Sequence, residues 1–256
     1  MNKQTVAVLD FGSQYTQLIA RRIREQNVYS EILPHTITAG ELKLKNVPAI
    51  ILSGGPSSVY DKNAPQVDPS ILSMGIPVLG ICYGLQLMIT QNGGNVTHKG
   101  QGEYGFAKMH TVNESPLLTN LANESQVWMS HGDEIDSLGN GFEIIAQSSN
   151  DVIAAIHHKD QPLYGVQFHP EVIHTLEGET IISNFLFNIA QCTADWTAAN
   201  FISETISKIQ DITGDNGKVI TGLSGGVDSS VVGTLLHNAI GTRSTCVFID
   251  HGLLRK

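Results

Sequence analysis

The sequence predicts an α/β fold with an open mixed, mostly parallel sheet flanked by helices, followed by a shorter β-α-β piece. Apolar segments of four or five residues, rich in Val and Ile, lie at 6–9, 29–33, 49–52 and 78–81. Segments of this length are typical of buried parallel strands. Helical patterns at 17–24 and 85–91 lie between them. Such alternation favours a parallel sheet with helices on its faces.

Residues 128–168 show closely spaced strand patterns, at 142–146, 153–157 and 163–168. This spacing predicts a partly antiparallel extension of the same sheet. A helix over 180–191 would then complete a first domain, residues 1–192.

Residues 193–213 are interpreted as a connecting helix. Ile202, Ile206 and Ile209 follow helical spacing, and Asp195 or Thr197 is a candidate N-cap.

For residues 214–256 the sequence predicts a turn at 214–217, followed by a second strand-loop-helix-strand unit. Its strands lie at 219–223 and 246–249, and a Gly/Ser loop precedes its helix at 230–240. One β-α-β unit leaves most of a parallel sheet uncovered. We therefore expect 214–256 to be the N-terminal fragment of an incomplete domain, and the chain to be a portion of a longer enzyme.

The composition is that of a globular chain, with 41% hydrophobic and 15% charged residues among 256 and a net charge of −9. The acidic balance argues against nucleic acid as a partner. The N-terminus lacks a signal-peptide pattern, and no apolar segment approaches the roughly 18 residues that span a membrane. Cys82, Cys192 and Cys246 are too widely spaced for a disulfide framework or a zinc site. We expect a cytoplasmic protein without a membrane partner or a prosthetic group.

Cys82 is the central residue of Gly80-Ile81-Cys82-Tyr83-Gly84, between a predicted strand and a predicted helix. The glycines allow a sharp turn that lifts the central side chain out of the sheet. At a helix N-terminus the dipole favours the reactive thiolate. The N–H group of Tyr83 would point to where an oxyanion forms. The alternative is an inert buried cysteine, which would not need the flanking glycines.

A partner for this thiol is predicted in Phe168-His169-Pro170-Glu171. A nucleophilic thiol needs an imidazole base, and the imidazole needs a carboxylate to fix its tautomer. Pro170 favours extended dihedrals at His169. Side chains two residues apart in an extended segment point to the same side, so Glu171 can reach the ring of His169.

Ser53-Gly54-Gly55-Pro56 follows the strand at 49–52 directly. Its glycines allow N–H groups to turn inward as the other half of an oxyanion hole. An ordinary tight turn explains these residues equally well.

The segments Gly-Ile-Cys-Tyr-Gly-Leu-Gln, Ser-Gly-Gly-Pro and Phe-His-Pro-Glu occur in the order and approximate spacing of class I glutamine amidotransferases. Residues 5–190 resemble that family. The resemblance implies that glutamine is hydrolysed by a triad of Cys82, His169 and Glu171. It also implies oxyanion donors from Gly55 and Tyr83, and glutamine contacts from Gln86, Ser130, His131 and Gly132. Packing or a turn would explain the glutamine contacts equally well.

A second motif, Ser224-Gly225-Gly226-Val227-Asp228-Ser229-Ser230, follows a predicted strand and opens a predicted helix. The N–H groups of such a loop form an anion site, and the helix N-terminus adds partial positive charge. The loop is not a Walker A motif, since no Lys follows the glycines. A Gly/Ser linker is the alternative, but the flanking strand and helix argue against it.

Ser-Gly-Gly-x-Asp-Ser resembles the PP-loop of N-type ATP pyrophosphatases. The resemblance implies that the loop grips the β,γ-pyrophosphate of ATP, and that an oxygen of the acceptor is adenylylated at the α-phosphorus. It makes Asp228 the expected magnesium partner, because carboxylate oxygens suit that ion. The strand that ends at 246–250 would lie near the adenine.

A class I amidotransferase joined to a PP-loop module resembles the GMP synthetase family, as do residues 10–15 and 248–255. The resemblance implies that xanthosine monophosphate, ATP and glutamine give GMP, AMP, pyrophosphate and glutamate. The alternatives are another class I amidotransferase, a γ-glutamyl hydrolase, or a non-catalytic module that binds glutamine or a nucleotide. We expect the chain as it stands only to hydrolyse glutamine, and the complete enzyme to be a homodimer through its C-terminal region.

Overall fold

The computed structural model describes residues 4–249, except for the side chains of residues 99–101. The chain divides into two compact units, Met1–Asp195 and Trp196–Lys256. In the described residues no helix is long and apolar enough to cross a membrane.

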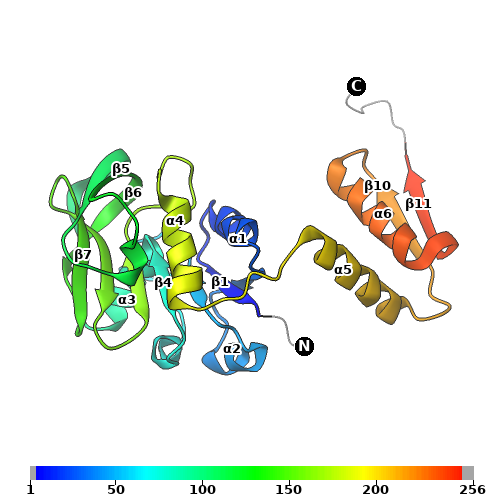
Figure 1. Ribbon diagram of the computed structural model, residues 1–256, viewed down its shortest axis with the longest axis horizontal. Helices are drawn as coiled ribbons and strands as arrows, with labels where there is room; N and C mark the ends of the chain where they lie inside the picture. The colour runs from blue at the N-terminus through cyan, green and yellow to red at the C-terminus, as the bar shows by residue number, and fades with distance from the viewer. Residues whose placement is uncertain (1–3, 250–256) are drawn as a thin grey trace. The chain divides into compact units, whose positions relative to one another are not determined.

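The first unit is built on a nine-stranded sheet with the order β2-β1-β3-β4-β9-β8-β7-β5-β6 (Figure 1). Its first five strands in this order are parallel, and the other four are antiparallel. The predicted α/β class and mixed sheet are therefore confirmed. The strands are β1 (Val6–Asp10), β2 (Ser30–Pro34), β3 (Ile50–Leu52), β4 (Val78–Ile81), β5 (Asn95–Thr111), β6 (Glu124–Ser137), β7 (Phe142–Ser148), β8 (Ile153–His158) and β9 (Leu163–Val166).

Helices cover both faces of the parallel part of the sheet. They are α1 (Thr16–Glu25), α2 (Ala39–Lys45), α3 (Tyr83–Gln91) and α4 (Gly178–Ser183), which continues as a π-helix over Asn184–Ile189. Short 3₁₀ turns occupy Pro69–Ser73 and Pro116–Leu118. The single helix predicted over 180–191 is thus an α-helix followed by a wider π turn.

Alternation along β1 divides the core between the two faces. Val6 and Val8 belong to the cluster that contains the apolar residues of α1 and α4, whereas Ala7 and Leu9 belong to the cluster of α2 and α3. All four side chains are fully buried. Successive residues of a strand point to opposite faces, so a strand covered on both faces must be apolar throughout.

The elements not predicted from the sequence include α2 and the paired strands β5 and β6. The short helix α2 is fixed by a capping box, in which Thr38 Oγ1 accepts from the N–H of Glu41 at 3.2 Å and a Glu41 carboxylate oxygen accepts from the N–H of Thr38 at 2.8 Å. The long strand β5 pairs with β6, but its register shifts between His98 and Glu103. Glycines in this stretch obscure the alternation by which a strand is recognised.

The fold brings the predicted motifs of the first unit to one edge of the sheet. Residues 11–15 follow β1, 53–56 follow β3, Cys82 follows β4 and His169 lies just after β9. These four strands are parallel neighbours, so their carboxyl ends share one edge. The strand order reverses around β1, and ligands of open α/β sheets bind at such switch points.

The second unit contains α5 (Ala198–Thr213), β10 (Val219–Leu223), α6 (Val227–Ile240), a 3₁₀ turn (Gly241–Arg243) and β11 (Ser244–Phe248). β10 and β11 pair in parallel, as a β-α-β unit requires. Of the two N-cap candidates for α5, Thr197 caps the helix, because its Oγ1 accepts from the N–H of Asn200 at 3.1 Å.

Candidate active site

Cys82 occupies a strained turn between β4 and α3. Its φ of 50° and ψ of −106° lie in a region that residues other than glycine rarely adopt. A Cβ at Gly80 would come within 2.7 Å of the Leu85 nitrogen, and one at Gly84 would overlap the carbonyl oxygen of Leu52. The predicted strand-turn-helix context is thus present, and the two glycines are there because neighbouring backbone leaves no room for a side chain.

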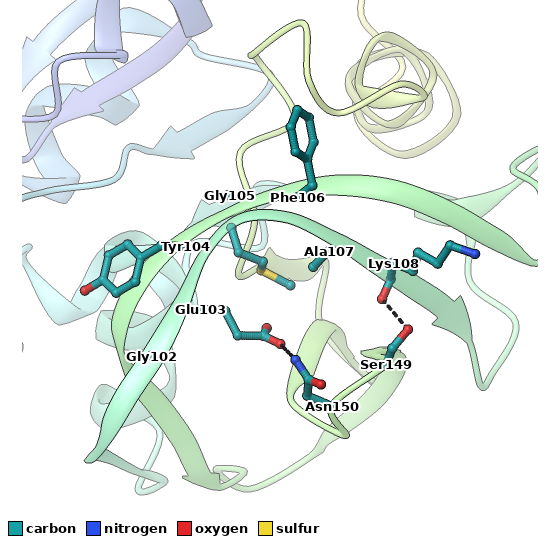
Figure 2. A pocket seen from close by; sticks show the side chains of 10 residues that line it. Gly102, Glu103, Tyr104, Gly105, Phe106, Ala107, Lys108, Ser149 and Asn150 are labelled. Carbon is teal, nitrogen blue, oxygen red and sulfur yellow. Dashed lines mark hydrogen bonds between the residues drawn. The ribbon is translucent and has the colours of Figure 1, made fainter.

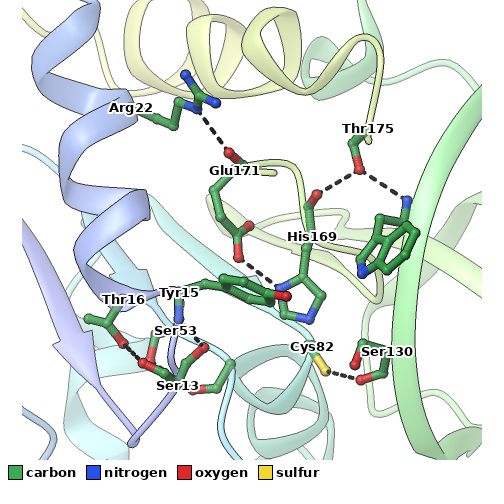
Figure 3. Close-up of polar contacts among 12 residues, drawn as sticks. Ser13, Tyr15, Thr16, Arg22, Ser53, Cys82, Ser130, His169, Glu171 and Thr175 are labelled. Carbon is green, nitrogen blue, oxygen red and sulfur yellow. Dashed lines mark hydrogen bonds and ion pairs between the residues drawn. The ribbon is translucent and has the colours of Figure 1, made fainter. Parts of the chain in front are cut away.

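His169 and Glu171 form a buried pair beside this cysteine. Nδ1 of His169 lies 2.8 Å from Oε1 of Glu171, whose side chain is fully buried (Figure 3). A carboxylate at Nδ1 keeps a proton on that nitrogen and directs Nε2 toward the thiol. Burial alone would lower the pKa of His169, but hydrogen bonds with Cys82 and Glu171 and the charges of those two groups raise it to about 10. The ring is therefore set to hold a proton beside the Cys82 sulfur at neutral pH.

Two backbone N–H groups are available near the thiol. Within residues 4–249, no acceptor takes a hydrogen bond from the N–H of Gly55 or from that of Tyr83. Ser53 fixes the turn that carries Gly55, because its hydroxyl accepts from the N–H of Phe11 at 3.0 Å and donates to the carbonyl of Gly54 at 2.8 Å. Gly54 passes beneath the triad, where an added Cβ would lie 3.2 Å from Cε1 of His169. This arrangement could stabilise an oxyanion on a bound substrate.

The loop that carries His169 and Glu171 is held by residues that the sequence did not indicate. Arg22 of α1 donates from Nε to the carbonyl of Glu171 at 2.9 Å. Thr175 donates from Oγ1 to the carbonyl of His169 at 2.6 Å and accepts from the N–H of Trp128 at 3.0 Å. Figure 3 shows both residues bracketing the loop. Their contacts join segments that are far apart in the sequence, so no local sequence pattern predicts these contacts.

A cavity of about 430 Å³ opens beside Cys82 and contains the residues expected to hold glutamine. Gln86, Ser130 and His131 all line it. Gln86 donates from its side-chain nitrogen to the carbonyl of Asp133 at 2.9 Å and to Oε1 of Gln167 at 3.2 Å. The structure therefore brings together the residues expected to contact the substrate glutamine. The side-chain amide N–H groups of Gln86, however, are already bonded to acceptors of the protein itself.

Glu103 is a buried carboxylate that the sequence did not reveal (Figure 2). Its Oε1 accepts from Ser148 at 2.9 Å and from Asn150 at 2.7 Å, while Oε2 lies 3.6 Å from Nε2 of His131. Nδ1 of His131 faces the carbonyl of Asp133 at 3.0 Å and must carry a proton there, since a carbonyl only accepts. Burial lowers the pKa of His131. At 3.6 Å, Oε2 of Glu103 and Nε2 of His131 are too far apart for a hydrogen bond, and neither atom has a hydrogen-bond partner among the described residues, so the carboxylate packs against a ring that lines the cavity at Cys82.

The Gly/Ser motif of the second unit joins β10 to α6. Gly225 has a φ of +79°, and Val227–Ser230 already form the first turn of α6, so the helix begins three residues earlier than predicted. The Ser224 and Ser229 hydroxyls lie 3.1 Å apart, and Ser230 donates to the carbonyl of Gly226 at 2.9 Å. The loop and the helix N-terminus together suit an anion such as a phosphate.

Asp228 lies in the first turn of α6 and is exposed. No group of three or more His, Cys, Asp or Glu side chains that could enclose a metal occurs among the described residues. Residues 250–255 of the predicted adjoining motif lie outside the described residues.

Comparison with known proteins decides the family. Residues 7–189 match the family described as Glutamine amidotransferase class-I. The chain belongs to the class I glutamine amidotransferase family. Residues 197–250 match a second family, described as NAD synthase. The first match spans the unit that contains Cys82, and the second spans the unit that contains the Gly/Ser motif.

Relatives of this amidotransferase are similar over its whole length. It is 55% identical over 254 residues to GMP synthase [glutamine-hydrolyzing] of Listeria innocua, covering 99% of the chain and 49% of the relative. It is 51% identical over 256 residues to that of Thermosynechococcus vestitus, covering 100% of the chain and 48% of the relative. The chain spans about half the length of these curated relatives. The resemblance to GMP synthetases is confirmed as a similarity.

A solved structure supports the fold. A Thermoplasma acidophilum protein described as one subunit of a GMP synthase superposes with a TM-score of 0.67 and 29% identity, covering 79% of this chain and 98% of that one.

Proposed function

We propose that the first unit hydrolyses the side-chain amide of L-glutamine, and that the chain supplies this activity to a GMP synthetase. The observation that carries the proposal is the meeting of Cys82, the His169–Glu171 pair and two unpartnered N–H groups at one edge of the sheet. Nucleophilic attack on an amide requires these three components together. Since the relatives are named GMP synthases, the proposed use of the ammonia is the formation of GMP.

In this mechanism Cys82 Sγ, as a thiolate, attacks the amide carbon of glutamine. The amide oxygen becomes an oxyanion and accepts from the N–H groups of Gly55 and Tyr83. When the carbon–nitrogen bond breaks, His169 gives its Nε2 proton to the nitrogen, which leaves as ammonia. A water molecule then attacks the thioester and returns a proton to His169, so glutamate leaves and the thiolate is restored.

The second unit would use the ammonia. The loop at Ser224–Ser230 is proposed to bind the β,γ-pyrophosphate of ATP while an oxygen of xanthosine monophosphate attacks the α-phosphorus. Pyrophosphate leaves, and ammonia then displaces AMP to give GMP. Magnesium would neutralise phosphate charge when bound, with Asp228 as its protein ligand. The exposed first turn of α6 supports this role, because the first N–H groups of a helix have no partner within it and favour an anion.

The test uses the complete gene product that contains this chain, supplied with ATP, magnesium, xanthosine monophosphate and either glutamine or ammonium. We expect GMP from both nitrogen sources. The Cys82→Ala variant should lose GMP from glutamine only, and Cys192→Ala, a second buried cysteine, should lose neither. A Cys82→Ala variant that still forms GMP from glutamine would contradict the proposed glutaminase. Failure to form GMP from ammonium in the parent protein would contradict the synthetase assignment.

A further inference from the structure

Two cavities meet at Cys82. The first, of about 430 Å³, is the glutamine cavity described above. The second, of about 250 Å³, is lined by residues 12–15 together with Gly55, Pro56, Cys82, Ser130 and His169, and is called here the His169 cavity. Gly55, Pro56, Cys82 and Ser130 belong to both. The thiol therefore has open space on two sides.

The two cavities differ in chemistry. Gln86, His131 and Asp133 line only the glutamine cavity, whereas His169 lines only the other. An amide under attack by Cys82 has its carbon at Sγ and its oxygen at the N–H groups of Gly55 and Tyr83. The nitrogen must face the group that protonates it, which is His169. With the amino-acid part of glutamine in the first cavity, the nitrogen points into the second.

The walls of the His169 cavity are firmly placed. Asp10 Oδ1 accepts from the N–H of Gly12 at 2.9 Å and from the Thr16 hydroxyl at 2.8 Å. Ser13 Oγ accepts from the N–H of Tyr15 at 3.0 Å. The Tyr15 ring then meets His169 edge to face, with centroids 5.2 Å apart (Figure 3). These contacts hold residues 10–15 in place beside His169, although none of these residues belongs to the proposed triad.

We infer that the His169 cavity is an amine site, through which ammonia leaves and into which small uncharged amines can enter. The inference rests on the proposed function. By microscopic reversibility, an amine that attacks the γ-glutamyl thioester takes the path by which ammonia departs. It forms a carbon–nitrogen bond, releases the Cys82 thiolate and passes a proton to His169. Tyr15 and the exposed Gln14 at its rim set the size of amine that fits.

In the test, two amines of different size compete for the thioester formed from glutamine, and the ratio of their two products is measured. Hydroxylamine and O-benzylhydroxylamine are both uncharged at neutral pH and give separable γ-glutamyl hydroxamates. Their ratio depends only on steps after the thioester, so slower acylation or partial unfolding of a variant leaves it unchanged. The variants are Tyr15→Ala, which enlarges the His169 cavity, and Gln14→Trp, which narrows its rim. Ser57→Trp narrows the glutamine cavity instead and is the matched control.

Tyr15→Ala should raise the proportion of the benzyl product about tenfold, the scale on which pocket size discriminates substrates, and Gln14→Trp should lower it. Ser57→Trp should raise KM for glutamine and leave the ratio as in the parent. An unchanged ratio in Tyr15→Ala and Gln14→Trp, or an equal change in Ser57→Trp, would overturn the inference while glutamate release continued. Absence of glutamate release from the parent protein would instead refute the proposed function.

Discussion

The carboxylate of Glu171 contacts the ring of His169, the residue two positions before it in the chain, with Oε1 2.8 Å from Nδ1. The residue between them is Pro170, which keeps this stretch extended. The base and the group that orients it are therefore delivered by one short segment. Because Arg22 and Thr175 hold the carbonyls of Glu171 and His169, the pair is fixed to α1 and, through the N–H of Trp128, to β6.

The first prediction concerns the two members of this pair. His169→Ala should lower kcat for glutamine hydrolysis by about 10³-fold or more, since it removes the proton carrier. Glu171→Gln should lower it less, because the carboxylate orients and supports the base but transfers no proton itself. Steady-state glutamate release measures both. Equal losses in two variants that remain folded by circular dichroism would show that Glu171 has another task.

The second prediction concerns pH. Hydrogen bonds and charges from Cys82 and Glu171 raise the pKa of His169 to about 10. The proton needed by departing ammonia is therefore present below that pH and lost above it. In the parent protein, kcat/KM for glutamate release should fall on the alkaline side only as pH approaches 10, since this ratio reports the pKa of the free enzyme. Glu171→Gln removes a raising charge, so its alkaline limb should move to lower pH. A limb that stays in place would show that His169 is not the titrating group.

The third prediction concerns backbone strain at Cys82. Glycine adopts a positive φ without steric cost, whereas alanine keeps strain of about 1–3 kcal/mol. Glycine also carries an opposing entropy cost of about 0.5–1 kcal/mol. Cys82→Gly should therefore be about 1 kcal/mol more stable than Cys82→Ala in urea unfolding. At Cys192, equally buried but without a positive φ, alanine should be the more stable substitution. The same order at both sites would show that the turn at Cys82 is not strained.

The fourth prediction concerns Glu103. Glu103→Ala removes the acceptor of Ser148 and Asn150 and the carboxylate that packs against the His131 ring, so the wall of the glutamine cavity should loosen. KM for glutamine should rise about tenfold with a smaller change in kcat, since the triad is untouched. Lys108 lines, together with Glu103, the separate pocket drawn in Figure 2. Lys108→Ala loses only an exposed ion pair with Glu124 and should leave both constants near the parent values. A loss confined to kcat would contradict a role at the binding wall.

Much of the fold and the candidate site could be predicted because their signals are local. Cys82 lies between glycines that the turn requires, and Glu171 follows His169 by two residues. The support was not predictable, since Arg22 contacts a residue 149 positions away and Glu103 contacts partners 45 and 47 positions away. The strand β5 was missed because glycines and a register shift interrupt its alternation.

The central claim is that Cys82 forms a covalent γ-glutamyl intermediate. The most direct measurement is mass spectrometry of the protein after reaction with an electrophilic analogue of glutamine. The account predicts one added group, located on the peptide that contains Cys82, prevented by excess glutamine and absent from Cys82→Ala. Cys192 and Cys246 should remain unlabelled, since neither lines the cavities at Cys82. Labelling that persists in Cys82→Ala, or that glutamine does not prevent, would contradict the account.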